Sequence, residues 1–504
     1  MAHHRRTVFF ICLIWAFLIH AVISDVCSTL ANLTTIDMSY PLSLSYATEQ
    51  STYWSTSCSL LKPSCIILPQ TTEEVITVVS ALRAHKEPFA IKSGGHNPNN
   101  NFASVDGGPL ISTKNLNRKI LLDPKSRTAR VGPGNRWDDV AKALDGTGLS
   151  AVGGRIGDVG VGGFLLGGGL SFMSTEHGWA ANSVLEYELV LANASAVTVT
   201  ADSHPDLFLS LKGGGNALGI VTSFLLQVYP QEEKIWGGTY TFDATPATAT
   251  KLLAAVRDFT TDYPDPKAGI ILTRETTAIG TVQIWILFVY YNGREPPAGV
   301  FDKFTAVGPL LSTCKTQSMA SLLTANNFAN VKGNAFTIGT ETIPLPRGDE
   351  DAGLRLLEEV LDNWQNVTSG VLGVTGLISS IAFQPIPRAM TQIARAKGGD
   401  LYDLDDDTDR IVLENNYAYT LPVDRNTIDS AMQRTYQGVR ELVERGTQAG
   451  ILTERYLPLF MNDGYYRQDY FGRLRPEMAQ LARRVRDGVD PEGLWKDRTG
   501  GFKL

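Results

Sequence analysis

The sequence is poor in cysteine and lacks the spacings of several common cofactor sites. It has five cysteines among 504 residues, and none of them form a Cys-x-x-Cys pair. This argues against a zinc site and against a redox dithiol. The sequence also has no run of basic residues with interleaved aromatics, and its formal charge is −7. A nucleic-acid partner is therefore not expected.

Two nucleotide-binding motifs are also absent. The dinucleotide fingerprint needs a third glycine, but Trp137 follows Gly132-Pro-Gly134 at that position, and Leu165 follows Gly160-Val-Gly162. No Gly-Lys-Ser/Thr phosphate loop occurs. The chain is thus expected to have neither a Rossmann nor a P-loop fold.

The first 24 residues differ from the rest of the chain. Arg5 and Arg6 precede an apolar run from Val8 to Ile19, and the small residue Ser24 follows. This order is typical of a signal peptide cleaved near Ser24, and the run is short for a membrane span. An uncleaved anchor is the alternative, because the apolar character continues through Ile23. We expect a secreted or endomembrane-lumen protein with no membrane span after cleavage.

The oxidising secretory pathway would allow disulfides and glycans. Beyond the signal segment, four cysteines permit three pairings: Cys27, Cys58, Cys65 and Cys314. We favour Cys27 with Cys65, which would attach the N-terminal arm to the first folded unit. Glycosylation acceptor triplets begin at Asn32, Asn193 and Asn366.

The patterning indicates an α+β fold. The stretch 72–84 is expected to be a helix, with Thr71 as its N-cap and two glutamates in its first turn. An amphipathic helix is also expected at 425–445. Strands are expected at 65–68, 89–92, 129–131, 185–192, 220–228, 236–242, 268–274, 281–291 and 411–419.

Three glycine-rich segments lie among the early strands. In 91–97, two adjacent glycines let backbone N–H groups turn toward an anionic ligand, although an ordinary Gly-Gly turn is the alternative. Segment 160–171 has five glycines between 162 and 169, which would cost a plain helix or strand about 1 kcal/mol each. Close packing against a planar ligand would offset that cost, with a flexible hinge as the alternative. The third segment, 212–222, leads directly into a strand.

Taken in order, these segments resemble the vanillyl-alcohol oxidase and p-cresol methylhydroxylase flavoprotein superfamily, in its berberine-bridge-enzyme-like branch. The resemblance rests on 63–69 with Glu74 and Val75, and on 91–96, 160–169, 178–184 and 206–222. The tail segments 490–493 and 500–504 resemble those of fungal members. The similarity covers about residues 27–222 and 456–504 and is loose between them.

The resemblance implies an α+β, two-lobed flavoprotein fold. One lobe would be an FAD-binding PCMH-type domain, and the other a substrate lobe with an antiparallel sheet covered by helices. We expect an N-terminal arm at 25–60, the FAD-binding domain at 61–232 and the substrate-binding domain at 233–454. The segment 455–504 is expected to return to the FAD-binding domain.

The resemblance also implies covalently bound FAD. His96 matches the family histidine that is joined to the flavin 8α-methyl, a bond that needs a neutral imidazole. Some members have a second, cysteinyl attachment, but Ile156 stands at that position, so we expect a single attachment. Further contacts to FAD are expected from Lys92, Ser93, Gly94, Gly95, Asn97, Gly160, Gly162, Gly163, Gly168, Asn182, Gly219, Val221 and Asn462.

The catalytic base is where the sequence departs from the family pattern. Family members often have a tyrosine two residues before an asparagine that lies close to the flavin. Here Phe460 precedes Asn462, so the asparagine matches and the phenol is absent. Oxidising a C–H bond beside oxygen or nitrogen needs another base for the O–H or N–H proton.

Several residues are candidates for this base. Tyr417 and Tyr419 share one face of the strand at 411–419 with Asn415, because side chains alternate along a strand. Glu414 is expected to face the other way. Tyr465 and Asp463 lie close to Asn462 in sequence. Each candidate, taken alone, is more typical of a packing aromatic or a solvated acid.

The function implied is that of an FAD-linked oxidase acting on a small organic substrate, such as an intermediate of fungal secondary metabolism. The step would be alcohol or C–H oxidation or oxidative cyclisation, with hydride passing to flavin N5 and dioxygen giving hydrogen peroxide. The alternatives are a carbohydrate oxidase of the same family and a flavin-containing cyclase with no net redox change. No metal is expected, since the acidic run 403–409 lacks the glycine of a calcium loop at its sixth position.

Overall fold

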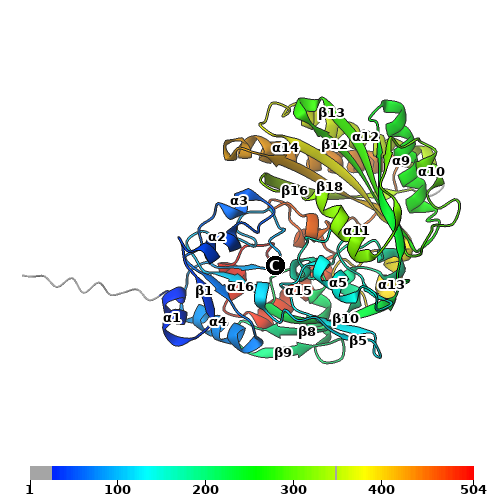
Figure 1. The fold of residues 1–504 in the computed structure, drawn as a ribbon. Helices are drawn as coiled ribbons and strands as arrows, with labels where there is room; N and C mark the ends of the chain where they lie inside the picture. The colour runs from blue at the N-terminus through cyan, green and yellow to red at the C-terminus, as the bar shows by residue number, and fades with distance from the viewer. Residues whose placement is uncertain (1–24, 347–348) are drawn as a thin grey trace, which may run out of the picture.

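The computed structural model describes residues 25–346 and 349–504, so the predicted signal peptide lies outside the described residues. Two lobes are visible in Figure 1, one in blue to cyan and the other in green to orange. Helices and sheets are mixed in both, which confirms the predicted α+β, two-lobed fold class. In the described part of the chain, no helix is both long and apolar enough to cross a membrane.

The first lobe contains two sheets. The smaller sheet pairs an antiparallel edge strand with three parallel strands, in the order β1 (Asp37–Ser39), β2 (Ile66–Leu68), β4 (Leu110–Ser112) and β3 (Ala90–Lys92). The larger sheet is antiparallel and has the order β5 (Leu121–Asp123), β6 (Thr128–Val131), β10 (Ile220–Pro230), β8 (Val184–Val190) and β9 (Ala196–Val199), with β7 (Leu149–Ala151) also paired to β10. The main helices of the first lobe are α1 (Val26–Leu33), α4 (Thr72–Ala84), α5 (Trp137–Leu144), α6 (Val161–Leu166) and α8 (Pro205–Leu211). The predicted helix at 72–84 is confirmed, and the Thr71 hydroxyl accepts a hydrogen bond from the Glu74 N–H at 3.3 Å.

The second lobe is built on an eight-stranded antiparallel sheet. Its order is β14 (Leu311–Ser312), β11 (Ile235–Phe242), β13 (Val282–Tyr291), β12 (Ala268–Thr277), β17 (Ile378–Ile386), β18 (Asp409–Tyr419) and β16 (Ala335–Leu345), with β15 (Lys315–Gln317) also paired to β11. Three long helices cover one face of this sheet: α9 (Pro246–Thr261), α12 (Glu350–Ser369) and α14 (Arg425–Gln448) (Figure 1). The opposite face of the sheet is directed toward the first lobe.

Strand β18 shows how the two faces of this sheet differ. Ile411 and Leu413 pack into the apolar core beneath the helices, and Tyr417 packs beside α14. Since side chains alternate along a strand, Glu414 and Ala418 point to the other face. Ala418 packs there with Trp54 of the N-terminal arm. This second face forms one wall of the site described below.

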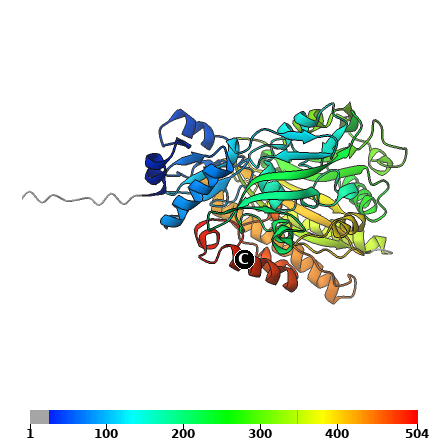
Figure 2. The same cartoon turned by 90° about the horizontal axis from the view of Figure 1, so that it is seen from below.

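The C-terminal segment returns to the first lobe. Its helices α15 (Pro476–Val489) and α16 (Leu494–Arg498) are drawn in red beside the blue and cyan elements (Figures 1 and 2). The backbone N–H of Phe89 donates to the Arg498 carbonyl at 2.9 Å, and the Arg498 guanidinium donates to the Glu87 carbonyl. These contacts link the two ends of the chain.

Cys27 and Cys65 form a disulfide, which confirms the favoured pairing, while Cys58 and Cys314 are free thiols. The bond joins α1 to the residue before β2. Replacing both cysteines by serine is expected to lower the free energy of unfolding by about 4 kcal/mol, because the cross-link closes a loop of sequence separation 38. Chemical denaturation measures this, with Cys314→Ser as the control. An unchanged denaturation midpoint in the double variant would refute the expectation.

Candidate active site

A large cleft lies between the glycine-rich segments of the first lobe and the free face of the second-lobe sheet. Its cavity volume is about 320 Å³, within the range of roughly 300–1,000 Å³ of common ligand pockets. Its walls include Ser93, Gly94, Gly95, His96, Asn97, Gly162, Gly163, Gly219, Val221, Ile271, Ile338, Glu414, Phe460 and Asn462.

Two glycines bring backbone into direct contact at the floor of the cleft. A Cβ on Gly94 would lie 2.6 Å from the Gly160 backbone, and one on Gly160 would lie 2.4 Å from the Gly94 nitrogen. No real Cβ tolerates such distances to backbone. The Ser93 hydroxyl bridges the same region, donating to the Pro133 carbonyl at 2.6 Å and accepting from the Gly162 N–H at 3.3 Å. The missing side chains of these two glycines let the two backbone segments pack closely, and the glycines that line the cleft, Gly94, Gly95, Gly162 and Gly163, form a cradle without side chains.

His96 lies in this cleft with one ring nitrogen unused. Its Nε2 is buried and has no hydrogen-bond partner in the described structure. The Trp54 ring stacks on the imidazole, with centroids 4.5 Å apart and planes 12° apart, and Phe336 stacks on Trp54 at 4.1 Å. Burial lowers the pKa of His96 to about 4, against the opposing effect of the Asp158 charge. The imidazole is thus held neutral at physiological pH, with a free nitrogen beside the cleft.

These features fit an FAD. The orphaned His96 nitrogen supplies a nucleophile, the glycine cradle leaves backbone exposed at the cleft wall, and the cleft has the size of a ligand pocket. Ile156 lines the cleft, and neither free cysteine does.

Asn462 fastens the glycine-rich segment to the C-terminal segment. Its Oδ1 accepts from the Gly169 N–H at 3.0 Å, and its Nδ2 donates to the Gly163 and Phe164 carbonyls at 3.2 and 3.3 Å. A Cβ on Gly167 would lie 2.6 Å from the Asn462 amide. The asparagine lines the cleft, and its amide positions the backbone around it.

Three charged side chains, Arg155, Glu414 and Asp463, line one part of the cleft, which we call its far end. Arg155 follows β7, Glu414 lies on β18, and Asp463 ends the short helix η6 (Met461–Asp463). Gln384 of β17 links two of them: its amide oxygen accepts from the Arg155 guanidinium, and its amide nitrogen donates to Asp463 at 2.9 Å. Burial and the neighbouring Asp463 charge raise the pKa of Glu414 to about 8, while burial raises the pKa of Asp463 to about 6.

The structure places the three candidate tyrosines away from the cleft. Tyr417 faces α14, where its hydroxyl is 3.1 Å from that of Thr368 and 3.0 Å from that of Thr435. Tyr419 is buried in the same cluster. Tyr465 donates to Asp429 of α14 and lies in this cluster too. None of the three lines the cleft, because the helices cover that face of the sheet and the cleft lies on the other.

Four predicted cofactor contacts also need correction. Lys92 points away from the cleft and pairs with the buried Glu49 at 2.5 Å. Asn182 donates to Asp400 at 3.1 Å and so anchors a second-lobe loop. Gly160 lies behind Gly94, and Gly168 packs on the Tyr402 ring, so neither lines the cleft itself. Their role is to shape the walls.

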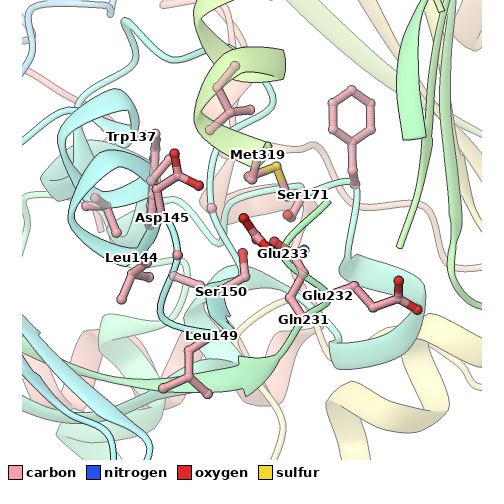
Figure 3. Close-up of a pocket in the computed structure, with 18 of the residues that line it drawn as sticks. Trp137, Leu144, Asp145, Leu149, Ser150, Ser171, Gln231, Glu232, Glu233 and Met319 are labelled. Atoms are coloured by element: carbon pink, nitrogen blue, oxygen red, sulfur yellow. The ribbon is translucent and has the colours of Figure 1, made fainter. Parts of the chain in front are cut away.

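A smaller hollow lies behind the cleft wall (Figure 3). The polar atoms of Asp145, Ser150, Ser171 and Glu233 gather around it, while Glu232 points away. Gly154 lines both this hollow and the cleft. The two spaces thus meet at Gly154.

The acidic run at 403–409 is held by arginines. Arg475 contacts Asp403 and Asp405, Arg410 contacts Asp405 at 3.1 Å, and Arg395 contacts Asp403 at 2.8 Å. The carboxylates of Asp403 and Asp405 are therefore paired with arginine side chains.

Comparisons with known proteins agree with this geometry. A family described as FAD binding domain matches residues 63–200. An uncharacterized FAD-linked oxidoreductase of Arthroderma benhamiae is 39% identical over 476 residues, covering 93% of each chain. The FAD-dependent monooxygenase FUP4 of Fusarium proliferatum is 30% identical, covering 90% of this chain and 87% of its own. The berberine bridge enzyme structure from Eschscholzia californica superposes with a TM-score of 0.72 at 18% identity, covering 95% of this chain and 99% of its own.

Proposed function

Since the chain belongs to the vanillyl-alcohol oxidase and p-cresol methylhydroxylase superfamily of FAD-linked oxidoreductases, in its berberine-bridge-enzyme-like branch, we propose that it is an oxygen-dependent oxidase with Glu414 as catalytic base. The substrate is a small organic molecule, in keeping with relatives from fungi that are named FAD-dependent monooxygenases. The observation that carries the proposal is a carboxyl group of raised pKa that lines the cleft of an FAD-linked enzyme and has no hydrogen-bond partner among residues 25–346 and 349–504.

The residues of the far end perform the proton chemistry. Glu414 takes the proton from the hydroxyl of the substrate, and its raised pKa makes the carboxylate a stronger base than an exposed glutamate. Phe460 stacks on Trp179 at 5.3 Å and offers no phenol. A flavin held by His96 and the glycine cradle would supply the acceptor for the hydride of the substrate carbon, and its reoxidation by dioxygen would give hydrogen peroxide.

We further propose that His96 holds the flavin covalently, and that this is the single attachment. The neutral imidazole and its unused nitrogen support the bond, and Ile156 supports the absence of a cysteinyl one. The proposed secretory location rests on the N-terminal segment and on three exposed acceptor asparagines, Asn32, Asn193 and Asn366.

Isotope-labelled dioxygen tests the reaction type. Purified protein would be supplied with a panel of hydroxylated small molecules while oxygen uptake, peroxide and product mass are followed. The oxidase predicts one peroxide per substrate oxidised, with the labelled oxygen in the peroxide. Label in the organic product would instead show a monooxygenase, and product without oxygen uptake would show a cyclase. Either result would overturn the oxidase.

The pH dependence should reveal the Glu414 carboxyl. The kcat/KM is expected to rise with pH through about 8, because the base must lose its proton. Stability should fall over the same range. A carboxyl whose folded pKa lies above the usual 4.5 stabilises the fold fully below 4.5 and loses that contribution as the pH rises through about 8.

Steady-state rates and urea midpoints measured from about pH 5 to about pH 9 check both slopes. In Glu414→Gln the stability slope should flatten. A wild-type kcat/KM that is independent of pH between about 6 and about 9 would contradict this assignment.

A further inference from the structure

The charges at the far end of the cleft define what kind of substrate can enter. Among the described residues that line the cleft, Arg155, Glu414 and Asp463 are the only arginine, lysine or carboxylic acid side chains. One is cationic and two are acidic. They come from three separate parts of the chain, so the fold itself assembles the group.

Two of these side chains still have free hydrogen-bonding capacity. In the described structure, Arg155 makes one side-chain hydrogen bond, to Gln384, and no ion pair within 4.0 Å. A guanidinium has five N–H donors, so most of them remain for a ligand. Glu414 has no side-chain hydrogen bond or ion pair among the described residues. Asp463, by contrast, is held by the buried Gln384 amide.

Building on the proposed function, we infer that the substrate is an uncharged molecule that carries its reacting hydroxyl beside a second oxygen. The hydroxyl donates to Glu414, and the second oxygen accepts from Arg155. The Arg155 cation and the carboxyl pair already balance each other, so an ammonium or a carboxylate would bring one uncompensated charge into the cleft. Placing an uncompensated charge in a buried site is costly.

The protonation state favours the same class. Burial raises the pKa of both the Glu414 and the Asp463 carboxyl, so near pH 7 the pair holds one proton between them and one negative charge, which balances Arg155. The group then has no net charge, and only a neutral ligand leaves this balance intact.

The other walls of the cleft indicate that the substrate also has an apolar body. Ile271, Ile338 and Phe460 line the cleft with Trp54. Such walls suit a hydrocarbon or aromatic skeleton and provide few partners for a heavily hydroxylated one. Arg155 is thus a specificity-determining residue, and a sugar is disfavoured as substrate.

Three probes of similar shape and different charge test the inference. The 2-methoxy derivatives of benzyl alcohol, benzylamine and benzoate, which carry the second oxygen and are named below by their parent compounds, would be titrated at pH 7 into the flavin-loaded protein, and binding read from the change in flavin absorbance. Benzyl alcohol is expected to bind at least about tenfold more tightly than either charged probe. In Arg155→Met the benzylammonium ion should become the preferred probe, since two acidic groups then remain alone. Arg440→Met, at an exposed pair on α14, is the control and should keep the wild-type order.

The comparison of the three probes in the wild-type protein does not depend on whether any variant folds. Equal or tighter binding of a charged probe, or no spectral change with benzyl alcohol, would overturn the inference. An unchanged order of the probes in Arg155→Met would do so as well. The flavin content of the same sample is read independently, so a protein without flavin would overturn the proposed function instead.

Discussion

Replacing Glu414 by glutamine is expected to lower the rate of substrate oxidation by about 10²–10⁴-fold, the usual contribution of a positioned general base. The amide matches the carboxyl in shape but cannot take the proton. Among the described residues the carboxyl has no hydrogen-bond partner, so the substitution breaks no hydrogen bond within that part of the chain. Anaerobic mixing with substrate, followed by flavin absorbance, measures the reductive step directly.

Tyr417→Phe is the matched control for this prediction. It removes a polar group three residues further along β18, on the helix-covered face, where the hydroxyl contacts Thr368 and Thr435. We expect a loss of stability of about 1 kcal/mol and a rate within about twofold of wild type. A Glu414→Gln enzyme that reduces its flavin at the wild-type rate would remove Glu414 as the base, and a large rate loss in Tyr417→Phe would favour the tyrosine.

The second large effect is expected at His96. In wild type, protein precipitated with acid should keep its yellow colour in the pellet, whereas in His96→Ala all of the flavin should pass to the supernatant. The imidazole is neutral and its Nε2 has no other partner, so its removal takes away the attachment point. The cradle and the cleft walls remain, so the native variant should still bind FAD without the bond.

His177→Ala provides the comparison, because this histidine stacks on Tyr229 at 3.7 Å and does not line the cleft. Its pellet should stay yellow. Flavin retained in the His96→Ala pellet would show a different attachment residue. Flavin lost from the wild-type pellet would show that no covalent bond exists.

Local patterns in the sequence predicted some elements of both lobes and missed others. The helix at 72–84 begins and ends as expected, because its capping threonine and acidic first turn are adjacent in sequence. Strands β16 and β17 were not predicted. β16 buries Thr340, Glu341 and Thr342 and includes Pro344, so neither a clean alternation nor a continuous apolar run marks it.

The far end of the cleft shows why sequence alone selected the wrong side of β18. The alternation of side chains separated Glu414 from Tyr417 correctly, but it could not say which face the helices would cover. No motif in the sequence marked Arg155 as a site residue, although it is adjacent to Ile156. Its partner Gln384 is 229 residues away, and Gln384 in turn holds Asp463, 79 residues further on.

His96 and the glycine clusters, in their order, were enough to predict an FAD-linked enzyme of this superfamily and its fold class, since each motif is a short run whose backbone chemistry is local. The disulfide was one of three pairings open to the sequence. The proposals of Glu414 as base and of a neutral substrate beside Arg155 and Asp463 rest on the tertiary structure. Charges and pKa values in a buried site depend on which groups the fold brings together and on how little water it leaves between them.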